Sequence, residues 1–391
     1  MPQSASGRIY FPGLNGLRFL AAAMVIVSHI EQFKKEEGLP NLDHTTLIGT
    51  AGEYGVSLFF VLSGFLITSL LLTEEKMTGG IDVRKFYMRR ILRIWPLYYL
   101  LIVLAFFVLP HFLEVGGAEN VLKTAFWPKL LLFIFFLPNL ALKVVPVVPF
   151  ASQAWSIGTE EQFYLVWPWL LKRFRRFLSL LLAGIPVVLI LGRKLLVVLC
   201  DRLAPGHLQH AGILLGRFLD TFNIEFMAIG GLGAWLLFEN KKKILSVLFH
   251  PAFQIGLYAT ILFSLATGLF GHVKVRYLFN AMLFTLLILN LAGNKNTLLK
   301  LESKGFRFLG KISYGLYMFH PLCFYLIFYS SRQFLPSMGI ALGNTFLYPT
   351  VFLLTIGMSW LSYEFFEKYF LRKKNRYTLV SSGDKIESSN A

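Results

Sequence analysis

Long apolar segments separated by basic clusters are the feature that most constrains the fold of this chain. A hydrocarbon core about 30 Å thick needs roughly 20 apolar residues in a helix, and lipid offers no hydrogen-bond partners to an open backbone. Segments of about that length recur along most of the sequence, and hydrophobic residues make up 55% of it. The sequence therefore predicts an all-α, polytopic bundle of transmembrane helices. Ten spans are expected, at 17–31, 54–73, 93–110, 157–171, 177–192, 218–238, 252–270, 276–293, 308–330 and 346–368.

The basic residues lie between the predicted spans. If successive spans alternate in direction, the basic clusters fall on one face, which the positive-inside rule makes cytoplasmic. Both termini then share the cytoplasmic face, and the number of full spans is even. This arrangement explains the formal net charge of +17 without a nucleic-acid partner, and none is expected. The clusters lie at 84–93, 172–176, 241–243, 295–311 and 368–376.

One more apolar run, LLLFIFFLPNLAL, is expected to be a broken or re-entrant segment. It is bracketed by Pro128, Pro138, Pro146 and Pro149. Proline removes a backbone donor and clashes with the preceding turn of a helix. A break at membrane depth persists only where protein or a cavity covers it. The prediction is therefore about ten spans plus one broken segment.

The chain is predicted to hold one membrane-embedded domain, residues 1–373. A polar segment, 374–391, follows it and is expected to be a disordered cytoplasmic tail. The first apolar run lacks a small-residue cleavage site, so we expect an uncleaved signal-anchor. The two cysteines, Cys200 and Cys323, lie in or beside different apolar runs and indicate neither a disulfide framework nor a metal site.

The first predicted span carries two ionisable side chains, Arg18 and His29. They are eleven residues apart, which is three helical turns plus about 20°, so they face the same side of one helix with about 16 Å between them. Ionisable groups inside a membrane commonly mark a functional pathway. The alternative is an interfacial pair, in which Arg18 extends to the cytoplasmic headgroups and His29 lies at the outer ones.

The segment RKFYMRRILR begins the third predicted span and has the residues of a phosphate-binding group. Arg89 and Arg93 share one side of a helix, and Arg90 lies within reach of Arg93. A guanidinium group binds phosphate through two parallel hydrogen bonds. The alternative is that these arginines only hold the loop in the cytoplasm.

An acidic pair follows in WSIGTEEQFY. In a helix that begins near Ser156, Glu160 and Tyr164 share a face, whereas Glu161 turns away by about 100°. A carboxylate beside an imidazole fixes its tautomer and stabilises the imidazolium formed on proton abstraction. The alternative is a hydrated pair of carboxylates near Trp155 in an aromatic belt.

Other polar residues lie within apolar runs. His320 directly precedes a proline and is either a second active-site imidazole or a helix-packing donor. Ser63 and Gly64, in VLSGF, favour close helix approach, and a nucleophilic Ser63 is the weaker alternative. Glu225 lies deeper in its span than Asp220 and is expected to line a cavity.

Six blocks of the sequence, in order, resemble the acyltransferase-3 family of membrane O-acyltransferases. LNGLR, whose arginine is separated from His29 by ten residues, resembles the first helix of the family, and GVSLFFVLSGFLIT resembles the second. FYMRRILRIWPLYY is similar to the basic start of the third helix, and WSIGTEEQFYLVWP to a tryptophan–serine–glutamate block. SYGLYMFHPL and SYEFFEKYFLRK resemble the last two helices. Asn15 and Ser57 stand where the family often has acidic residues, so no carboxylate role is carried over to them.

The resemblance covers about 13–373 and implies a stand-alone membrane acyltransferase domain. It implies transfer of an acyl group, most simply acetyl, from cytoplasmic acyl-CoA to a hydroxyl of a cell-surface glycan or lipid-linked saccharide. A bacterial plasma membrane is the expected location, and no metal is expected. The catalytic residues it implies are His29, Glu160 and Arg18, with Glu160 orienting His29, and the acyl-CoA phosphates are assigned to Arg89, Arg90 and Arg93. Substrate-binding or supporting roles are expected for Trp155, Ser156, Tyr164, His320 and Glu225.

Two other classes of function share some of these features. A transporter or flippase for a glycolipid or small anion also uses broken helices and midplane ionisable groups. It has no need, however, of a base at one membrane edge and an arginine cluster at the other, and the sequence shows no internal repeat. A catalytically silent acyl-CoA sensor is the third class, and in that case loss of His29 leaves acyl transfer unchanged.

Overall fold

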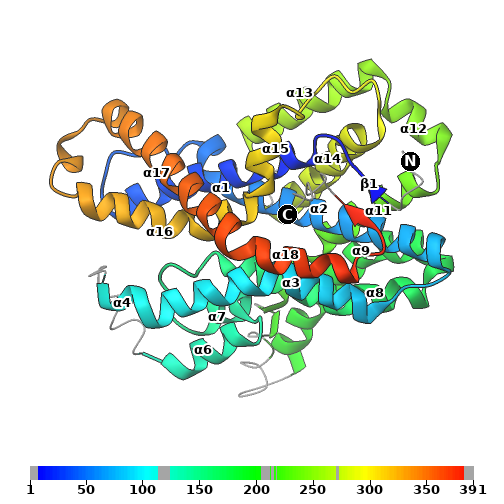
Figure 1. Cartoon of the computed structure of the whole chain (residues 1–391), viewed down its shortest axis with the longest axis horizontal. Coiled ribbons are helices and arrows are strands. Elements are labelled where there is room, and N and C mark those ends of the chain that lie inside the picture. The colour runs from blue at the N-terminus through cyan, green and yellow to red at the C-terminus, as the bar shows by residue number, and fades with distance from the viewer. Residues whose placement is uncertain are drawn as a thin grey trace, which may run out of the picture.

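The computed structural model of the chain describes residues 8–112, 124–203, 218–269 and 273–382, together with 212, 215 and 216. These residues form an assembly of helices (Figure 1) with one short parallel strand pair, β1 (Arg8–Ile9) and β2 (Ser381–Ser382). The helices are α1 (Leu14–Glu36), α2 (Thr46–Thr78), α3 (Val83–Val103), α4 (Leu109–Phe112), α6 (Phe126–Ile134), α7 (Pro138–Val144), α8 (Ala154–Arg173), α9 (Leu178–Leu203), α11 (Ile224–Phe238), α12 (Lys242–Leu248), α13 (Pro251–Thr267), α14 (Val273–Gly293), α15 (Lys304–Lys311), α16 (Ser313–Ser331), α17 (Ile340–Ser362) and α18 (Lys368–Lys374). Single π-helical turns continue α3 into α4 and α17 into α18.

Among the described residues, 7 helices are long and apolar enough to cross a membrane, or up to 9 if each of two bent helix pairs is one span. The predicted helical, multi-span fold is confirmed, whereas the predicted count of ten spans is not. The predicted span 157–171 does form a helix, α8. Its first half contains Glu160, Glu161 and Gln162, so its mean hydropathy is too low for it to be counted among the candidate membrane spans. The pairs α12–α13 and α15–α16 bend by 63° and 68°, so the predicted span 308–330 runs across a sharp turn.

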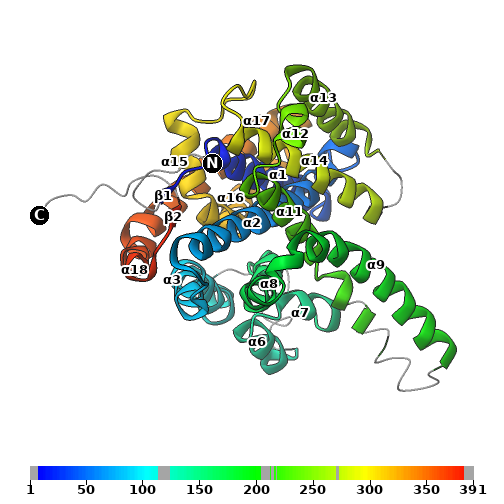
Figure 2. The ribbon, with the colours of Figure 1, turned by 90° about the vertical axis from the view of Figure 1, so that its right-hand side faces the viewer.

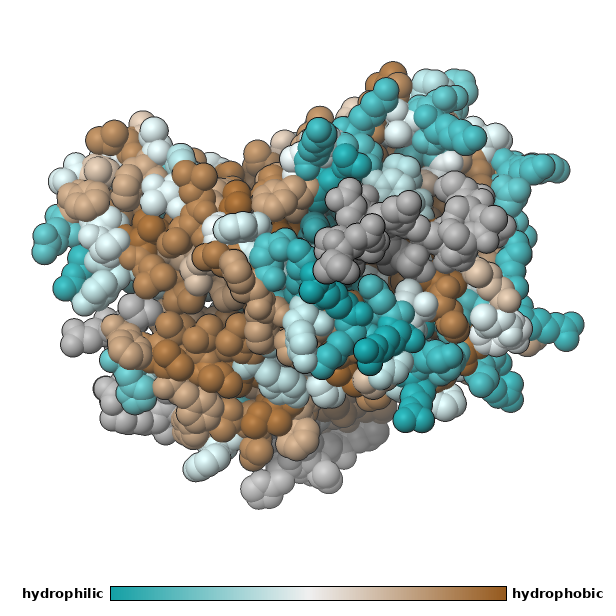
Figure 3. All heavy atoms as spheres, viewed as in Figure 1, coloured by the Kyte–Doolittle hydropathy of each residue, from teal (hydrophilic) through white to brown (hydrophobic). Residues whose placement is uncertain are grey.

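Large hydrophobic side chains are exposed over much of the outer surface of the bundle, as contact with lipid requires. Of the candidate spans, α2 is the most buried and α9 the least. On the face drawn in Figure 3, hydrophobic residues cover the half that contains α4, α16 and α17, whereas hydrophilic residues gather around the end of α18 and the start of α3. The chain is therefore a multi-pass membrane protein with α2 in its core.

The proline-bracketed run is broken, as predicted, into α6 and α7. Phe136, between them, has a left-handed φ of 57°. The carbonyl groups at the break find partners on neighbouring helices. Tyr98 OH donates to Phe133 O at 2.8 Å, and Gln162 Nε2 donates to Phe136 O at 3.0 Å. The bundle thus satisfies the interrupted backbone, which a break at membrane depth requires.

Small residues let α2 and α11 approach closely. α2 packs against α1, α11 and α14. A Cβ added to Gly64 would lie 1.9 Å from the Met227 carbonyl oxygen, and one added to Gly230 would lie 2.1 Å from that of Val61. Both contacts are with backbone atoms, which cannot rotate away as a side chain can. The close approach predicted at Gly64 is therefore confirmed.

We expect Gly64→Ala to destabilise the folded protein by about 3 kcal/mol, the upper part of the usual range for an overpacked core. The added methyl group meets a backbone carbonyl, so α2 and α11 must separate to admit it. The measurement is the melting temperature of the purified protein in detergent. Gly184→Ala is the matched control, because a Cβ there meets no atom within 4 Å. Equal melting temperatures for the two variants would contradict the close packing.

The two ends of the described chain lie together. β1 and β2 pair in parallel, and Figure 2 shows this pair beside α18. The turn after α18, Asn375–Tyr377, packs on α3. Residues 374–382 of the predicted tail are thus part of the described structure, and residues 383–391 lie outside it.

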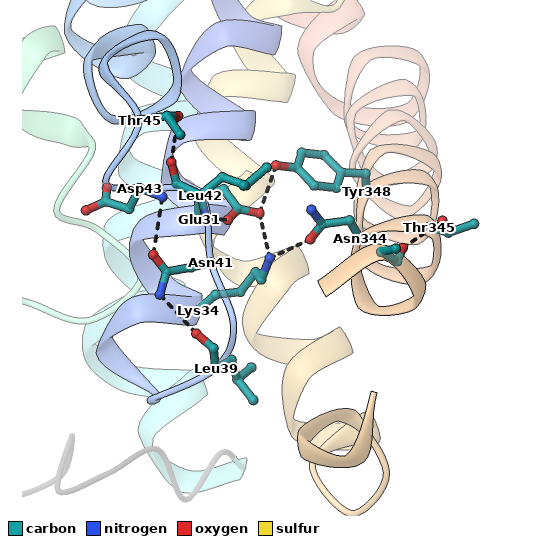
Figure 4. Close-up of polar contacts among 11 residues, drawn as sticks. Glu31, Lys34, Leu39, Asn41, Leu42, Asp43, Thr45, Asn344, Thr345 and Tyr348 are labelled. Atoms are coloured by element: carbon teal, nitrogen blue, oxygen red, sulfur yellow. Dashed lines mark hydrogen bonds and ion pairs between the residues drawn. The ribbon is translucent and has the colours of Figure 1, made fainter. Parts of the chain in front are cut away.

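Acidic side chains form hydrogen bonds near both ends of α1 and hold it against neighbouring elements. Near its start, Glu302 accepts a hydrogen bond from the backbone N–H of Gly13. Near its end, Glu31 is fully buried and accepts hydrogen bonds from Lys34 Nζ at 2.7 Å and from Tyr348 OH at 2.8 Å (Figure 4). Glu31 also accepts one from a backbone N–H of the loop after α1. These contacts join α1 to the segment before α15, to α17 and to its own following loop.

Candidate active site

A cavity lies between α1, α2, α3, α8 and α16, and each of these helices contributes polar residues to its lining. Arg18 enters it from α1, and Arg90 and Arg93 enter it from α3. Glu160 of α8 is the one carboxylate among the lining residues that the structure describes. The cavity therefore carries an excess of positive charge. The other polar lining residues are Ser63, Ser156, Tyr164, Ser313, Tyr314 and Tyr317.

Glu160 is held by two hydroxyl groups. Ser63 Oγ donates to its Oε1 at 2.9 Å, and Tyr164 OH donates to its Oε2 at 2.7 Å. The charges of Arg18 and Arg90 also act on this carboxyl group. The prediction that Glu160 and Tyr164 share a face of one helix is confirmed. The contact from Ser63 was not predicted, because the motif VLSGF favours close packing, with a nucleophilic Ser63 as the weaker alternative, and neither indicates a partner on α8.

The predicted arginine trio is divided between two environments. Arg90 and Arg93 line the cavity, where Arg18 joins them. The Arg90 guanidinium lies 5.9 Å from the centroid of the Tyr164 ring, and its buried Nε has no hydrogen-bond partner within the described part of the chain. The cationic group that the structure assembles is therefore Arg18, Arg90 and Arg93.

Arg89 faces away from this cavity and holds the C-terminal segment instead. It donates to Glu74 Oε2 at 2.6 Å and to the carbonyl oxygen of Tyr377 at 2.9 Å. In the same segment, Lys374 lies close enough to Arg90 and Arg93 for their charges to act on it. From the sequence, Lys374 was expected at the start of a disordered tail. Its basic neighbours in sequence are typical of any cytoplasmic cluster, so no feature of the sequence predicted that Lys374 would lie near Arg90 and Arg93.

His29 meets a second imidazole, that of His320 on α16. The distance from His29 Nδ1 to His320 Nε2 is 2.8 Å, and the ring centroids are 5.0 Å apart. His320 is fully buried, and its Nδ1 lies 2.7 Å from the Tyr317 carbonyl oxygen. Glu160, the partner expected for His29, makes its hydrogen bonds in the cavity instead. Because Tyr317 also lines the cavity, the imidazole pair lies about one helical turn beyond the cavity wall.

Three further predicted residues have different placements. Ser156 lines the cavity, with its Oγ 2.7 Å from Tyr317 OH. Trp155 packs edge-on against an aromatic ring of α2 and is not among the lining residues. Glu225 does not line this cavity either, because it is buried in a two-point ion pair with Arg193 of α9, at 2.8 and 3.0 Å.

Helices with lipid-compatible outer surfaces around a cavity lined by guanidinium groups define an integral-membrane protein suited to binding an anionic group. Within the described ranges, no group of three His, Cys, Asp or Glu side chains is placed to hold a metal ion. Residues 11–364 match the model of the acyltransferase-3 family, described as an acyltransferase domain, and the chain belongs to this family.

Curated relatives give a finer comparison. The chain is 28% identical over 324 residues to the peptidoglycan O-acetyltransferase OatA of Listeria monocytogenes, covering 80% of this chain and 49% of that protein. It is 28% identical over 388 residues to the O-acetyltransferase OatA of Staphylococcus aureus, covering 93% of this chain and 58% of that protein. The chain thus spans about half the length of these relatives. No solved structure matches it.

Proposed function

We propose that this protein transfers an acyl group, most simply acetyl, from cytoplasmic acyl-CoA to a hydroxyl group of a cell-surface glycan. The observation that carries the proposal is the gathering of Arg18, Arg90 and Arg93 in one cavity with Glu160. Family membership supports the reaction class. The relative named as a peptidoglycan O-acetyltransferase supports peptidoglycan or its lipid-linked precursor as the acceptor, and a bacterial plasma membrane as the location.

Three arginines form the proposed binding site for the phosphates of the acyl donor. CoA carries a diphosphate and a 3′-phosphate, and guanidinium groups bind phosphate oxygens through paired hydrogen bonds. Arg18, Arg90 and Arg93 present three such groups against one carboxylate. The buried Nε of Arg90, which has no partner among the described residues, is a donor that a phosphate oxygen would satisfy. The pantetheine arm then extends along α1, which brings the thioester to His29.

His29 is the proposed general base. It removes the proton of the acceptor hydroxyl as the hydroxyl oxygen attacks the thioester carbonyl carbon. The carbon–sulfur bond then breaks, the acyl group stays on the acceptor oxygen, and the CoA thiolate takes up the proton from His29. Glu160, held by Ser63 and Tyr164 beside Arg18, keeps the donor-binding side chains in place. A transporter without covalent chemistry has no observation in its favour, because the family match is to acyltransferases.

Calorimetric titration of the purified protein with CoA tests the donor site. Arg93→Gln is expected to weaken CoA binding about 10-fold, because one charged hydrogen-bonding contact contributes roughly 1.5–3 kcal/mol. Arg173→Gln, at the exposed end of α8, is the matched control and should bind CoA as the wild type does. In parallel, membranes receive labelled acetyl-CoA, and the glycan fraction is counted. Absence of CoA binding would overturn the donor assignment, and binding without label transfer would favour a sensor.

A further inference from the structure

We infer that His320 is the positioning residue that fixes the tautomer of His29, and that Pro321 enables it by freeing a backbone carbonyl in α16. The inference rests on the proposed function, since it takes His29 as the general base. It goes further by assigning the proton abstraction to one ring nitrogen, Nε2, and by replacing the expected carboxylate partner with a neutral imidazole.

The argument begins with the missing backbone donor. In an α-helix the carbonyl of Tyr317 would accept a hydrogen bond from the N–H of the residue four positions later. That residue is Pro321, inside α16, and proline has no N–H. A buried carbonyl in a membrane protein needs another donor. His320 Nδ1, 2.7 Å from the Tyr317 oxygen, supplies it. Because a carbonyl oxygen only accepts, this nitrogen of His320 must carry the hydrogen.

The position of the hydrogen on His320 determines the position of the hydrogen on His29. His320 is fully buried, so its neutral form is favoured over an unpaired cation. A neutral imidazole protonated on Nδ1 offers Nε2 as an acceptor. His29 Nδ1, 2.8 Å from that nitrogen, must therefore donate. His29 is left with its hydrogen on Nδ1 and a free lone pair on Nε2. When Nε2 takes a proton, the hydrogen bond to His320 persists and stabilises the imidazolium.

The free nitrogen lies at the approachable end of the pair. His29 is only partly buried, in contrast to His320. The ring carbon bonded to Nε2, Cδ2, faces Gly52 of α2, where an added Cβ would lie 4.0 Å away. The other end of the pair is closed by the Tyr317 carbonyl.

Steady-state acetyl transfer by His320→Gln and His320→Leu tests the role of His320. The amide oxygen of Gln can accept the hydrogen of His29 Nδ1, whereas Leu fills the space without accepting. We expect His320→Leu to lower kcat at least about 10-fold, a part of what a positioned base contributes, with the KM for acetyl-CoA unchanged. His320→Gln should retain most of the kcat. Equal losses in both variants, or a changed KM at intact kcat, would overturn the role.

Pro321→Ala tests the role of the unpaired Tyr317 carbonyl group without altering either imidazole. The restored N–H competes with His320 Nδ1 for the Tyr317 oxygen, so kcat should fall severalfold while the KM for acetyl-CoA stays constant. Pro186→Ala is the matched control, because it restores a helical N–H in α9, far along the chain from this pair. A kcat equal to the wild type in Pro321→Ala would overturn the part assigned to the proline.

Nitrogen-15 NMR of histidine-labelled protein reads the tautomer independently of turnover. The expected result is a neutral His29 protonated on Nδ1, with that preference lost in His320→Leu. Protonation of His29 on Nε2 would overturn the inference even if acetyl transfer is intact. The expected tautomer in a protein that transfers no acetyl group would support the inference and reject the proposed function alone.

Discussion

His29→Ala is expected to reduce acetyl transfer to the glycan fraction by a factor of about 10²–10⁴, the usual contribution of a positioned general base. The substitution removes the only proposed proton acceptor at the reacting hydroxyl and leaves a residue that suits a helix. CoA binding should be unchanged, because Arg18 lies about 16 Å from His29 along α1, and Arg90 and Arg93 line the cavity from α3. The measurement is label transferred from acetyl-CoA in membranes with matched amounts of protein.

The control for this prediction is His111→Ala, which removes an exposed histidine of α4 and should transfer label at the wild-type rate. A full rate for His29→Ala would exclude His29 from the chemistry. A parallel loss of CoA binding would show instead that the substitution has disturbed the cavity.

Glu225→Leu is expected to lower the stability of the protein by about 3–5 kcal/mol, the cost of leaving a buried charge without its partner. The side chains of Arg193 and Glu225 are only 6% and 5% exposed, and the carboxylate accepts from both terminal nitrogens of the guanidinium group. α9 is the least buried of the candidate spans, so this pair is a major polar link between α9 and α11. Thermal unfolding in detergent, followed by tryptophan fluorescence, measures the loss.

Two comparisons separate this effect from a general loss of charge. The double variant Arg193→Leu/Glu225→Leu should recover most of the stability, because it leaves no buried charge unpaired. Glu239→Leu removes a carboxylate from a partly exposed pair with Arg175 and should cost less than about 1 kcal/mol. If Glu225→Leu and Glu239→Leu destabilise the protein equally, the burial of the Arg193–Glu225 pair is contradicted.

The fold could be predicted from sequence as far as local hydrophobicity determines it. The positions of most long helices and the break before α7 follow from apolar runs and prolines, whereas α1, α2 and α9 extend beyond the predicted spans. The number of spans could not be predicted, because the bend between α15 and α16 depends on tertiary packing around Ile312. α8 shows a second limit. Its polar half, which includes Glu160 and Glu161, is compatible with burial because Ser63 and Tyr164 donate hydrogen bonds to Glu160 and Trp95 donates one to Glu161.

The site could be predicted as a set of residues but not as a set of contacts. Arg18, Arg90 and Glu160 were all candidate site residues, but Glu160 was expected beside His29 at the outer edge of the membrane and Arg90 at the cytoplasmic donor site, whereas in the structure the three line one cavity. Helical spacing alone placed Arg89 with Arg93, since it does not reveal which side of α3 faces Glu74. The partner of His29 was also unpredictable, because His320 is 291 residues away in sequence. The one local signal was the proline after His320, whose effect on the preceding carbonyl is visible only once the ring is placed.

The fastening of α1 at both ends has a consequence for the length of the donor. If α1 slid along its axis, it would break the hydrogen bonds of Glu31 or those of Glu302. The free energy lost with these bonds is larger than a small movement of the helix could recover. α1 thus keeps its position relative to the neighbouring elements, and the separation of Arg18 and His29 along it is set by the helical rise. With phosphates bound at the arginines, the length of α1 between Arg18 and His29 determines how far the donor must extend. If the arginines bind the CoA phosphates as proposed, only a donor whose flexible arm bridges about 16 Å brings its thioester to the imidazole, and acetyl phosphate is expected not to substitute for acetyl-CoA.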